Sequence, residues 1–182
     1  YSPLHQTVKV VCYLFQYSKS IPPGYQPVRR DRLLQEAEHD SYKARGKFPE
    51  PTICSHCGAV FHIGRWQWGI TVASDAHRAS CPACQRVHDH CPAGYVFLTG
   101  AFLQAHHEEI VHLVRNEAER QRAEHPLKRV MAIDEAEVEI QVSTTDLHLA
   151  RALGEAVHHA YQGELEFHYN PQEMLLRVHW SR

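Results

Sequence analysis

Long apolar runs and secretion signals are absent from this sequence. No stretch of its 182 residues approaches the roughly 18 consecutive apolar residues of a membrane-spanning helix. Nor does the chain show a signal peptide, which would join a charged start to an apolar run. These absences predict a soluble protein of the reducing cytoplasm that has no membrane partner.

Motifs for catalysis are also missing. The sequence contains no phosphate-binding glycine loop, no nucleophile elbow and no pair of carboxylates in a suggestive apolar setting. Residues 107–112 resemble a zinc-peptidase helix, but His107 and His112 are spaced too far apart to share one helical face. We therefore expect a protein that is not an enzyme.

The net charge is only −2, but the charges are unevenly distributed. Residues 1–67 carry 9 Lys and Arg against 5 Asp and Glu, a balance of +4. Residues 134–182 carry 3 against 9, a balance of −6. The basic part is therefore a candidate for binding a polyanion, and the acidic part is not.

What the sequence does contain is two Cys-x-x-Cys pairs. They are Cys54-Ser55-His56-Cys57 and Cys81-Pro82-Ala83-Cys84, with 23 residues between them. A two-residue gap directs both sulfurs of a pair at one point, and Gly58 supplies the backbone freedom that closes the first turn. This spacing predicts a zinc ribbon with one structural Zn²⁺ ion, held by Cys54, Cys57, Cys81 and Cys84.

The spacing leaves a second metal open. Four thiolates at similar positions also bind iron in rubredoxin-like electron carriers. Disulfides are disfavoured because the remaining cysteines, Cys12 and Cys91, are isolated in the sequence. Since four thiolates leave no open coordination position, zinc at this site would stabilise the fold and would not activate water.

The segment before the first cysteine pair is rich in basic residues. Residues 27–50 are expected to form an extended polar arm, with a short helix over 31–39 as an option. The arm can lie along phosphates or serve as a solvated linker, and both alternatives are open. Its basic residues are Arg29, Arg30, Arg32, Lys43, Arg45 and Lys47.

Within the ribbon, residues 64–69 alternate aromatic and polar residues between two glycines. The alternation predicts a strand with Trp66 and Trp68 on one face. If that face is exposed, the two indoles and Arg65 can bind RNA by stacking on unpaired bases. If it is covered, the indoles form the core of the ribbon, which is the favoured alternative because Trp is so often buried.

After the ribbon, the pattern predicts a long helix and then a small sheet domain. Thr99 is expected to cap a helix that ends before Pro126 and whose charged second half projects from the body. Residues 127–182 read as β-β-α-β-β, which predicts an antiparallel sheet with one covering helix. Asp146 is expected to cap that helix, and Gly154 within it predicts close packing on the sheet.

The expected fold class is therefore α+β, in five parts. The parts are an N-terminal segment without a functional signal (1–26), the basic arm (27–50), a treble or simple zinc ribbon (51–98), the long helix (99–126) and the α+β domain (127–182).

Two stretches resemble a known family. Residues 54–66, which join the first cysteine pair to an aromatic motif, resemble the zinc region of the large-ribosomal-subunit nuclear-export adaptor family and its archaeal homologues. Residues 144–154 resemble the helix start in the following domain of that family, and the full chain resembles a group of its short bacterial relatives. Members usually carry more Cys-x-x-Cys pairs, and the eukaryotic adaptors add export signals, so nuclear export is not implied. The resemblance implies zinc on the four cysteines and binding to the large ribosomal subunit or its rRNA.

Together these features predict a non-enzymatic zinc-ribbon protein that binds the ribosome or structured rRNA. It would act as an assembly, hibernation or quality-control adaptor, and its acidic C-terminal domain would contact a ribosomal protein. Two alternatives stay open, a zinc-stabilised protein–protein regulatory module and a rubredoxin-like iron electron carrier.

Overall fold

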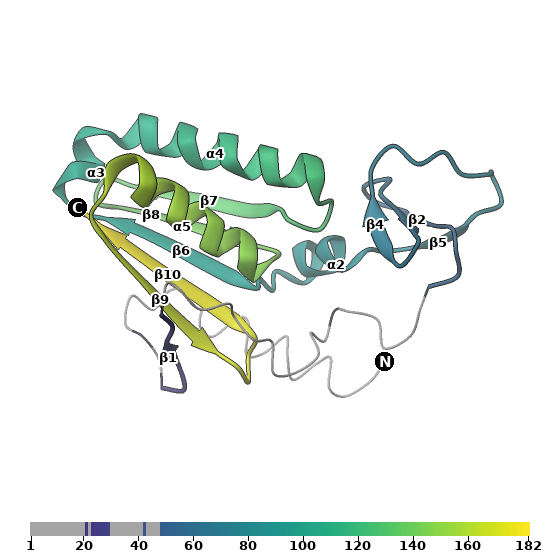
Figure 1. The fold of residues 1–182 in the computed structure, drawn as a ribbon, viewed down its shortest axis with the longest axis horizontal. Coiled ribbons are helices and arrows are strands. Elements are labelled where there is room, and N and C mark those ends of the chain that lie inside the picture. The colour runs from purple at the N-terminus through teal and green to yellow at the C-terminus, as the bar shows by residue number, and fades with distance from the viewer. Residues whose placement is uncertain (1–20, 22, 30–41, 43–47) are drawn as a thin grey trace.

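The structure is a computed structural model that describes residues 21, 23–29, 42 and 48–182. It is an α+β fold with two mixed sheets, one of six strands and one of four, which lie toward opposite ends of the molecule (Figure 1). We call residues 48–93, which carry the four predicted metal ligands, the metal-binding unit, and residues 94–182 the α+β body.

The metal-binding unit contains the small sheet and one helix. Its strands, in the order β4-β3-β2-β5, are β2 (Thr52–Cys54), β3 (Val60–His62), β4 (Arg65–Gln67) and β5 (His77–Ala79). β2 pairs with β5 in parallel, and the other pairs are antiparallel. Helix α2 (Pro82–Asp89) follows β5 closely and lies between the two sheets (Figure 1). The second cysteine pair therefore sits at the start of a helix.

The large sheet has the strand order β1-β9-β10-β6-β8-β7. Its strands are β1 (Gln26–Pro27), β6 (Gly94–Thr99), β7 (Val130–Ala136), β8 (Glu139–Thr144), β9 (Glu164–Asn170) and β10 (Leu175–Ser181). β6 lies between β8 and β10 and runs parallel to β10, so the expectation of an antiparallel sheet is wrong. The residues 95–98 are all buried, as expected of a central strand. β6 thus belongs to the α+β body, although the predicted division assigned it to the ribbon.

Helix α5 (Leu147–Tyr161) covers the middle of this sheet. As predicted, the carboxylate of Asp146 caps the helix by accepting a hydrogen bond from the Leu149 N–H at 2.9 Å. Gly154 allows the close packing that its position predicted, since a Cβ there would lie 2.4 Å from Cγ1 of Val178. The apolar stripe of α5 forms the main core of the protein with β6, β8, β9, β10 and the two helices between β6 and β7.

The predicted long helix is split in two. Thr99 ends β6 instead of capping a helix, and α3 (Ala101–Ala105) and α4 (His107–Glu124) are separated by His106. Gly100 turns the chain before α3 with a φ of +109°, and a Cβ there would collide with the backbone of Arg182.

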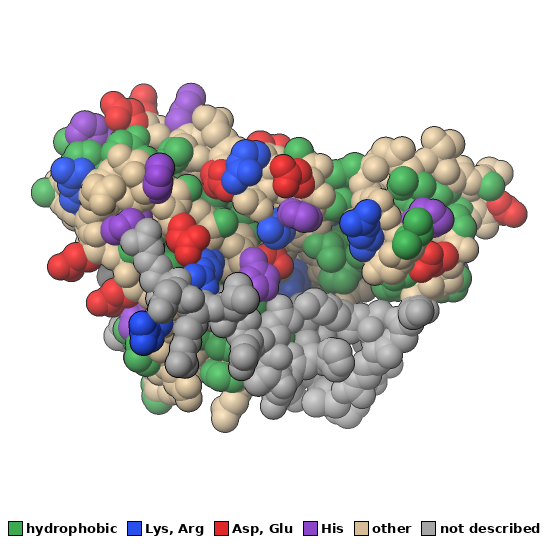
Figure 2. Space-filling model, viewed as in Figure 1, with side chains coloured by type: hydrophobic (Ala, Val, Ile, Leu, Met, Phe, Trp, Pro, Cys, Tyr) green, Lys and Arg blue, Asp and Glu red, His purple; other side chains and the backbone are tan. Residues whose placement is uncertain are grey.

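The second half of α4 does not project from the body. The helix packs beside α5 (Figure 1), and its residue Ala118 is only 8% exposed. On the face drawn in Figure 2, most of the acidic side chains lie over the α+β body.

Among the described residues, none of the helices combines the length and the apolar character that a membrane crossing requires. The optional helix at 31–39 lies outside the described residues.

Candidate metal centre

The two Cys-x-x-Cys pairs meet at a single point in the metal-binding unit. All four sulfur atoms lie within 4.8 Å of one another, and none is in a disulfide. The Sγ atoms of Cys54 and Cys84 are 3.8 Å apart, as are those of Cys57 and Cys81. Four sulfurs at about 2.3 Å from a central ion in a tetrahedron would be about 3.8 Å apart. The cluster can therefore hold one tetrahedral metal ion.

The first cysteine pair is shaped by a tight turn after β2. The Gly58 N–H donates to the Cys54 carbonyl at 3.0 Å, and the Cys54 N–H donates to the Ala59 carbonyl at 2.7 Å. Gly58 has a φ of +75°, which a side chain would strain. The predicted need for glycine after this pair is confirmed.

The second pair uses the start of α2. Pro82 occupies the first turn, and the sulfur of Cys81 caps the helix by accepting a hydrogen bond from the Cys84 N–H at 3.4 Å. The Cys81 N–H in turn donates to the sulfur of Cys54 at 3.3 Å. Backbone groups from both pairs therefore point at sulfur, as the ligands of a thiolate site require.

The four thiols differ in acidity because their surroundings differ. Burial works against a charged Cys54, but the backbone N–H groups of Cys81, Cys57 and His56 outweigh it and lower the pKa of Cys54 to about 6. Burial raises the pKa of Cys81, and the nearby sulfurs of Cys57 and Cys54 raise it further. Four neighbouring thiolates repel one another unless a cation lies between them. The donor set thus fits a bound cation, which would keep all four sulfurs deprotonated.

A side chain of the α+β body also reaches the cluster. Arg129 donates from Nη2 to Cys57 Sγ at 2.9 Å and from Nη1 to Cys84 Sγ at 3.2 Å. Burial opposes the charged guanidinium, but the sulfurs of Cys57 and Cys84 hold the pKa of Arg129 above its usual value. Arg129 was missed in the sequence because it lies 45 residues beyond the last ligand.

Cys91 is disulfide-bonded, so its isolated position in the sequence did not exclude a disulfide as we had expected. The reducing cytoplasm, which was inferred partly from that isolation, stays a prediction. Zinc also stays a prediction, because a set of four thiolates binds zinc and iron alike.

The two indoles of the ribbon occupy covered positions. Trp66 is only 8% exposed and contacts Phe48 and Phe61, with ring centroids 5.5 Å and 5.6 Å away. Trp68 is half-buried, and its Nε1 donates to the Arg122 carbonyl at 2.7 Å. These positions match the core alternative, and the burial of Trp66 leaves little ring surface for a stacked base.

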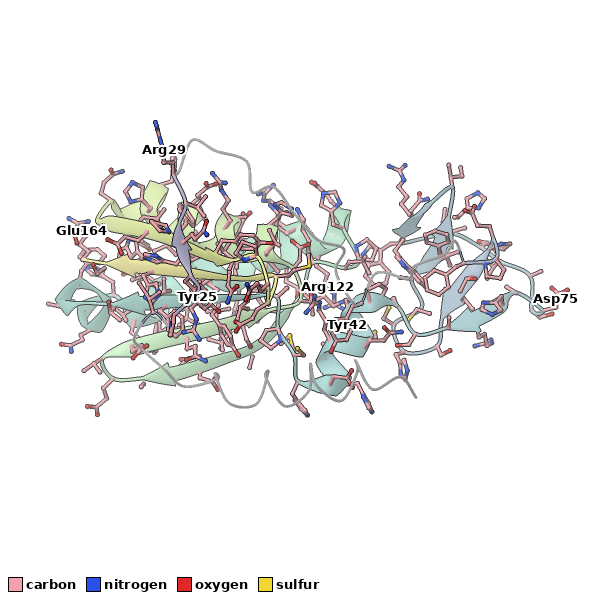
Figure 3. The ribbon with its side chains drawn as sticks, turned by 90° about the horizontal axis from the view of Figure 1, so that it is seen from below. Tyr25, Arg29, Tyr42, Asp75, Arg122 and Glu164 are labelled. Atoms are coloured by element: carbon pink, nitrogen blue, oxygen red, sulfur yellow. The ribbon has the colours of Figure 1, made fainter. Side chains whose placement is uncertain are left out.

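The candidate RNA-binding arginines that the structure describes are far apart. Arg65 is exposed at the start of β4, and Arg29 is exposed next to β1. In Figure 3, Arg29 lies toward the large-sheet end of the molecule, whereas Asp75 marks the opposite end. The two arginines are therefore not brought together. The remaining predicted residues of the arm, Arg30, Arg32, Lys43, Arg45 and Lys47, lie outside the described residues.

Tyr42 is an anchor within the predicted arm that sequence reasoning missed. It is 5% exposed, and the guanidinium of Arg86 in α2 lies 4.4 Å from the centre of its ring. Its hydroxyl donates to the carboxylate of Asp89 at 3.3 Å. A lone aromatic residue among polar neighbours was the available signal, because aromatic side chains bury large areas.

The turn between β3 and β4 presents an exposed apolar side chain. Ile63 is 75% exposed and has a φ of +51°, a costly conformation for a β-branched residue. The carboxylate of Glu50 holds the turn, since it accepts hydrogen bonds from the Ile63 N–H at 2.7 Å and the Gly64 N–H at 3.1 Å. The tip of the ribbon is therefore fixed, with Ile63 and Arg65 facing solvent.

Comparisons with known proteins do not place the chain in a family. A scan against protein-family models, a search of curated proteins and a search of solved structures each found no match. The resemblance to the ribosomal export-adaptor family accordingly stays a prediction that is based on residues 54–66 and 144–154.

Proposed function

We propose that the protein is a non-enzymatic, metal-stabilised adaptor that binds RNA, with the large ribosomal subunit or structured rRNA as its target. The observation that carries this proposal is the packing of Tyr42 and Phe48, two residues of the predicted basic arm, on the metal-binding unit. Phe48 packs on Phe61 with ring centroids 5.4 Å apart, and Tyr42 packs on α2. In the sequence, Lys43, Arg45 and Lys47 lie between these two anchors.

Anchoring matters because binding of phosphates by a free tail costs conformational entropy. Tyr42 and Phe48, which precede and follow these three cations in the sequence, are packed on the folded unit, so we expect RNA binding to cost less entropy there than in a free tail. The exposed tip of the ribbon adds Arg65, whose planar guanidinium can pair with a phosphate or stack on a base. We propose that these four residues form the RNA contact of the metal-binding unit, and Trp66 is left out because it is buried.

The α+β body has the opposite charge. Residues 134–182 carry 3 Lys and Arg against 9 Asp and Glu, so they would be repelled by phosphates. We propose that the body faces away from RNA and contacts a ribosomal protein. This same acidity favours the second candidate function, a protein–protein regulatory module without RNA affinity.

The test measures binding of the metal-loaded full chain to purified large subunits and to rRNA fragments over a range of salt concentrations. The test variant replaces Lys43, Arg45 and Lys47 with Ala. The control variant removes the same charge from α4 by replacing Arg115, Arg120 and Arg122 with Ala. We expect the test variant to bind more weakly and to flatten the salt dependence by roughly one unit of slope per lost contact. The control should keep the slope of the wild type.

The outcomes separate the two functions. Co-sedimentation with the large subunit at low salt that is lost at high salt supports the adaptor. A chain that retains its metal but binds neither subunits nor rRNA at moderate salt contradicts it and favours the protein-only module. An equal slope for the test variant and the wild type would remove the arm from the proposed contact.

A further inference from the structure

One side chain of the α+β body, Arg129, contacts the cysteine cluster of the metal-binding unit. Its guanidinium bridges the two cysteine pairs, because it donates to Cys57 of the first pair at 2.9 Å and to Cys84 of the second at 3.2 Å. The same Nη2 lies 3.6 Å from the sulfur of Cys81. Three of the four candidate ligands are thus within reach of one cation that none of the ligand-bearing elements supplies.

Hydrogen bonds within the α+β body hold Arg129 in the position from which it contacts the sulfur atoms. The Nε of Arg129 donates to the Pro126 carbonyl at 2.7 Å. Its backbone N–H donates to Oγ1 of Thr145 at 2.9 Å, and its carbonyl accepts from the Thr145 N–H, also at 2.9 Å. The guanidinium is therefore aimed by bonds within the α+β body, and little conformational entropy is lost when it contacts the cluster.

The charge of the centre explains why a cation is placed there. Four thiolates around a divalent ion have a formal charge of −2, which is costly to bury without compensation. Arg129 supplies one positive charge and two directed N–H donors, and such outer contacts on ligand atoms commonly strengthen metal binding by 10- to 100-fold. A lysine would supply the charge without the planar fork.

The other contacts between the two parts surround Arg129. The Nε1 of Trp68 donates to the Arg122 carbonyl at 2.7 Å, and the Trp68 ring lies under the Arg129 guanidinium at 5.8 Å. Leu127 packs against the core of the metal-binding unit. A bound ion would fix the positions of the sulfurs that Arg129 contacts. Loss of the ion would therefore free the acceptors that tie Arg129 to the metal-binding unit at this junction.

We propose that Arg129 is a positioning residue of the metal centre, and that it couples retention of the metal to docking of the metal-binding unit on the α+β body. This inference does not depend on RNA binding. It holds for zinc and for iron, because both ions make the sulfurs anionic acceptors.

The first experiment measures metal release from the zinc-loaded full chain into a chromogenic chelator. We expect Arg129→Met to release zinc at least about tenfold faster than the wild type and Arg129→Lys to fall between them. The control is Arg78→Met, which removes an exposed arginine of β5 in the same unit. A release rate of Arg129→Met equal to that of the control would overturn the proposal.

A second readout separates a contact on sulfur from a general loosening of the fold. In the cobalt-loaded protein, the sulfur-to-cobalt charge-transfer band reports the electron density on the thiolates. Loss of N–H donors in Arg129→Met should shift this band to lower energy, whereas the control should leave it in place. An unshifted band with faster release would mean that Arg129 acts only through packing, which also overturns the proposal.

The coupling is tested by hydrogen exchange on the wild type with and without metal. Removal of zinc should expose the amides around Trp68 and Arg122 on both sides of the junction, and Arg129→Met should expose them even when zinc is bound. Unchanged protection of the Arg122 segment in the metal-free wild type would refute the coupling, since that segment belongs to the α+β body and not to the metal-binding unit.

Discussion

The two parts of this molecule are stabilised in different ways. Among the described residues, the core of the α+β body contains nineteen buried side chains, nearly all of them aliphatic or aromatic. The core of the metal-binding unit contains five, and two of these, Cys54 and Cys81, are candidate metal ligands. A segment of this size cannot bury enough apolar surface to fold on its own. The ion would therefore replace a hydrophobic core in one part of the chain while the other part needs none.

This difference gives the two parts different sensitivities. The body depends on packing that is present whenever the chain is folded. The metal-binding unit would depend on an ion that can be gained or lost, so its structure would follow the metal supply. The proposed RNA contact lies on the metal-binding unit, whose structure would depend on the ion. Arg129 links this unit to the α+β body, whose structure would not. If the two parts are stabilised independently, a substitution or a chelator should destabilise one of them without destabilising the other.

The largest effect is expected from removal of the metal. A chelator, or the substitution Cys84→Ser, should unfold the metal-binding unit, because a structural Zn²⁺ ion contributes about 10 kcal/mol or more to a small thiolate domain. Hydrogen exchange should show loss of protection over residues 48–93 and a persistent cooperative unit over 94–182, with added exposure only in the Arg122 segment at the junction. Ser80→Ala, next to the second pair, serves as the control. A unit that stays protected without metal would show that its small core suffices.

A cavity in the core of the α+β body should destabilise the body and leave the metal-binding unit intact. Leu153 is fully buried in α5, so Leu153→Ala should destabilise the body by about 2–5 kcal/mol and leave the metal content unchanged. The measurement is urea unfolding followed by circular dichroism, with bound metal measured in parallel. Val138→Ala, at a residue that is 52% exposed, should change stability by less than about 0.5 kcal/mol. Metal loss that accompanies Leu153→Ala would contradict the independence of the body.

Local features were predictable from the sequence because short-range geometry determines them. The spacing within each cysteine pair directs two sulfurs to one point, and the four ligands do cluster. The cap at Asp146 and the close packing at Gly154 follow from side-chain chemistry within one helix, and both are confirmed. In these cases a single residue or a short motif carries the signal, even where its contact, such as Val178 for Gly154, comes from another element.

Long-range features were not predictable in the same way. The apolar strand β6 was expected, but its place between β8 and β10 depends on pairing with residues that lie about 45 and 80 positions away. The capping role given to Thr99 failed because Thr99 belongs to β6 and because the carbonyl of Arg182, 83 positions further along the chain, accepts the Phe102 N–H at the start of α3. Arg129 looked like any surface arginine, since only the tertiary fold brings it to Cys57.

Overpacking at Gly154 tests how tightly the body is assembled. An added Cβ would lie 2.4 Å from Cγ1 of Val178, so Gly154→Ala should cost about 1–3 kcal/mol, although alanine is the better helix former. A double-mutant cycle measures the free energy of unfolding of the wild type, Gly154→Ala, Val178→Ala and the double variant. The double variant should be more stable than the sum of the single effects predicts, because Val178→Ala removes the clashing methyl group. Strict additivity would place the strain elsewhere.

The smallest effect concerns the pH dependence of the body. His179 in β10 stacks on Phe97 with ring centroids 4.8 Å apart, and His168 lies beside it at 5.7 Å. Burial lowers the pKa of His179 to about 4, and the neighbouring charges of His168 and Arg177 add to the shift. The unfolded chain binds this proton near pH 6.5, so stability is complete above that value and declines as the pH falls toward 4.

This loss should amount to about 1–2 kcal/mol, once allowance is made for the partial exposure of the ring. The matched variant His179→Phe keeps a ring against Phe97 but cannot titrate. The midpoint of urea unfolding is measured for both proteins at pH 7.5 and at pH 4.5, and the bound metal is measured at each pH. The midpoint reports on the α+β body, and the metal content reports on the metal-binding unit. We expect the variant to lose less stability on acidification than the wild type, while both release metal alike as the thiolates take up protons. Equal acid losses in the two proteins would mean that His179 is not the group through which the body responds to pH.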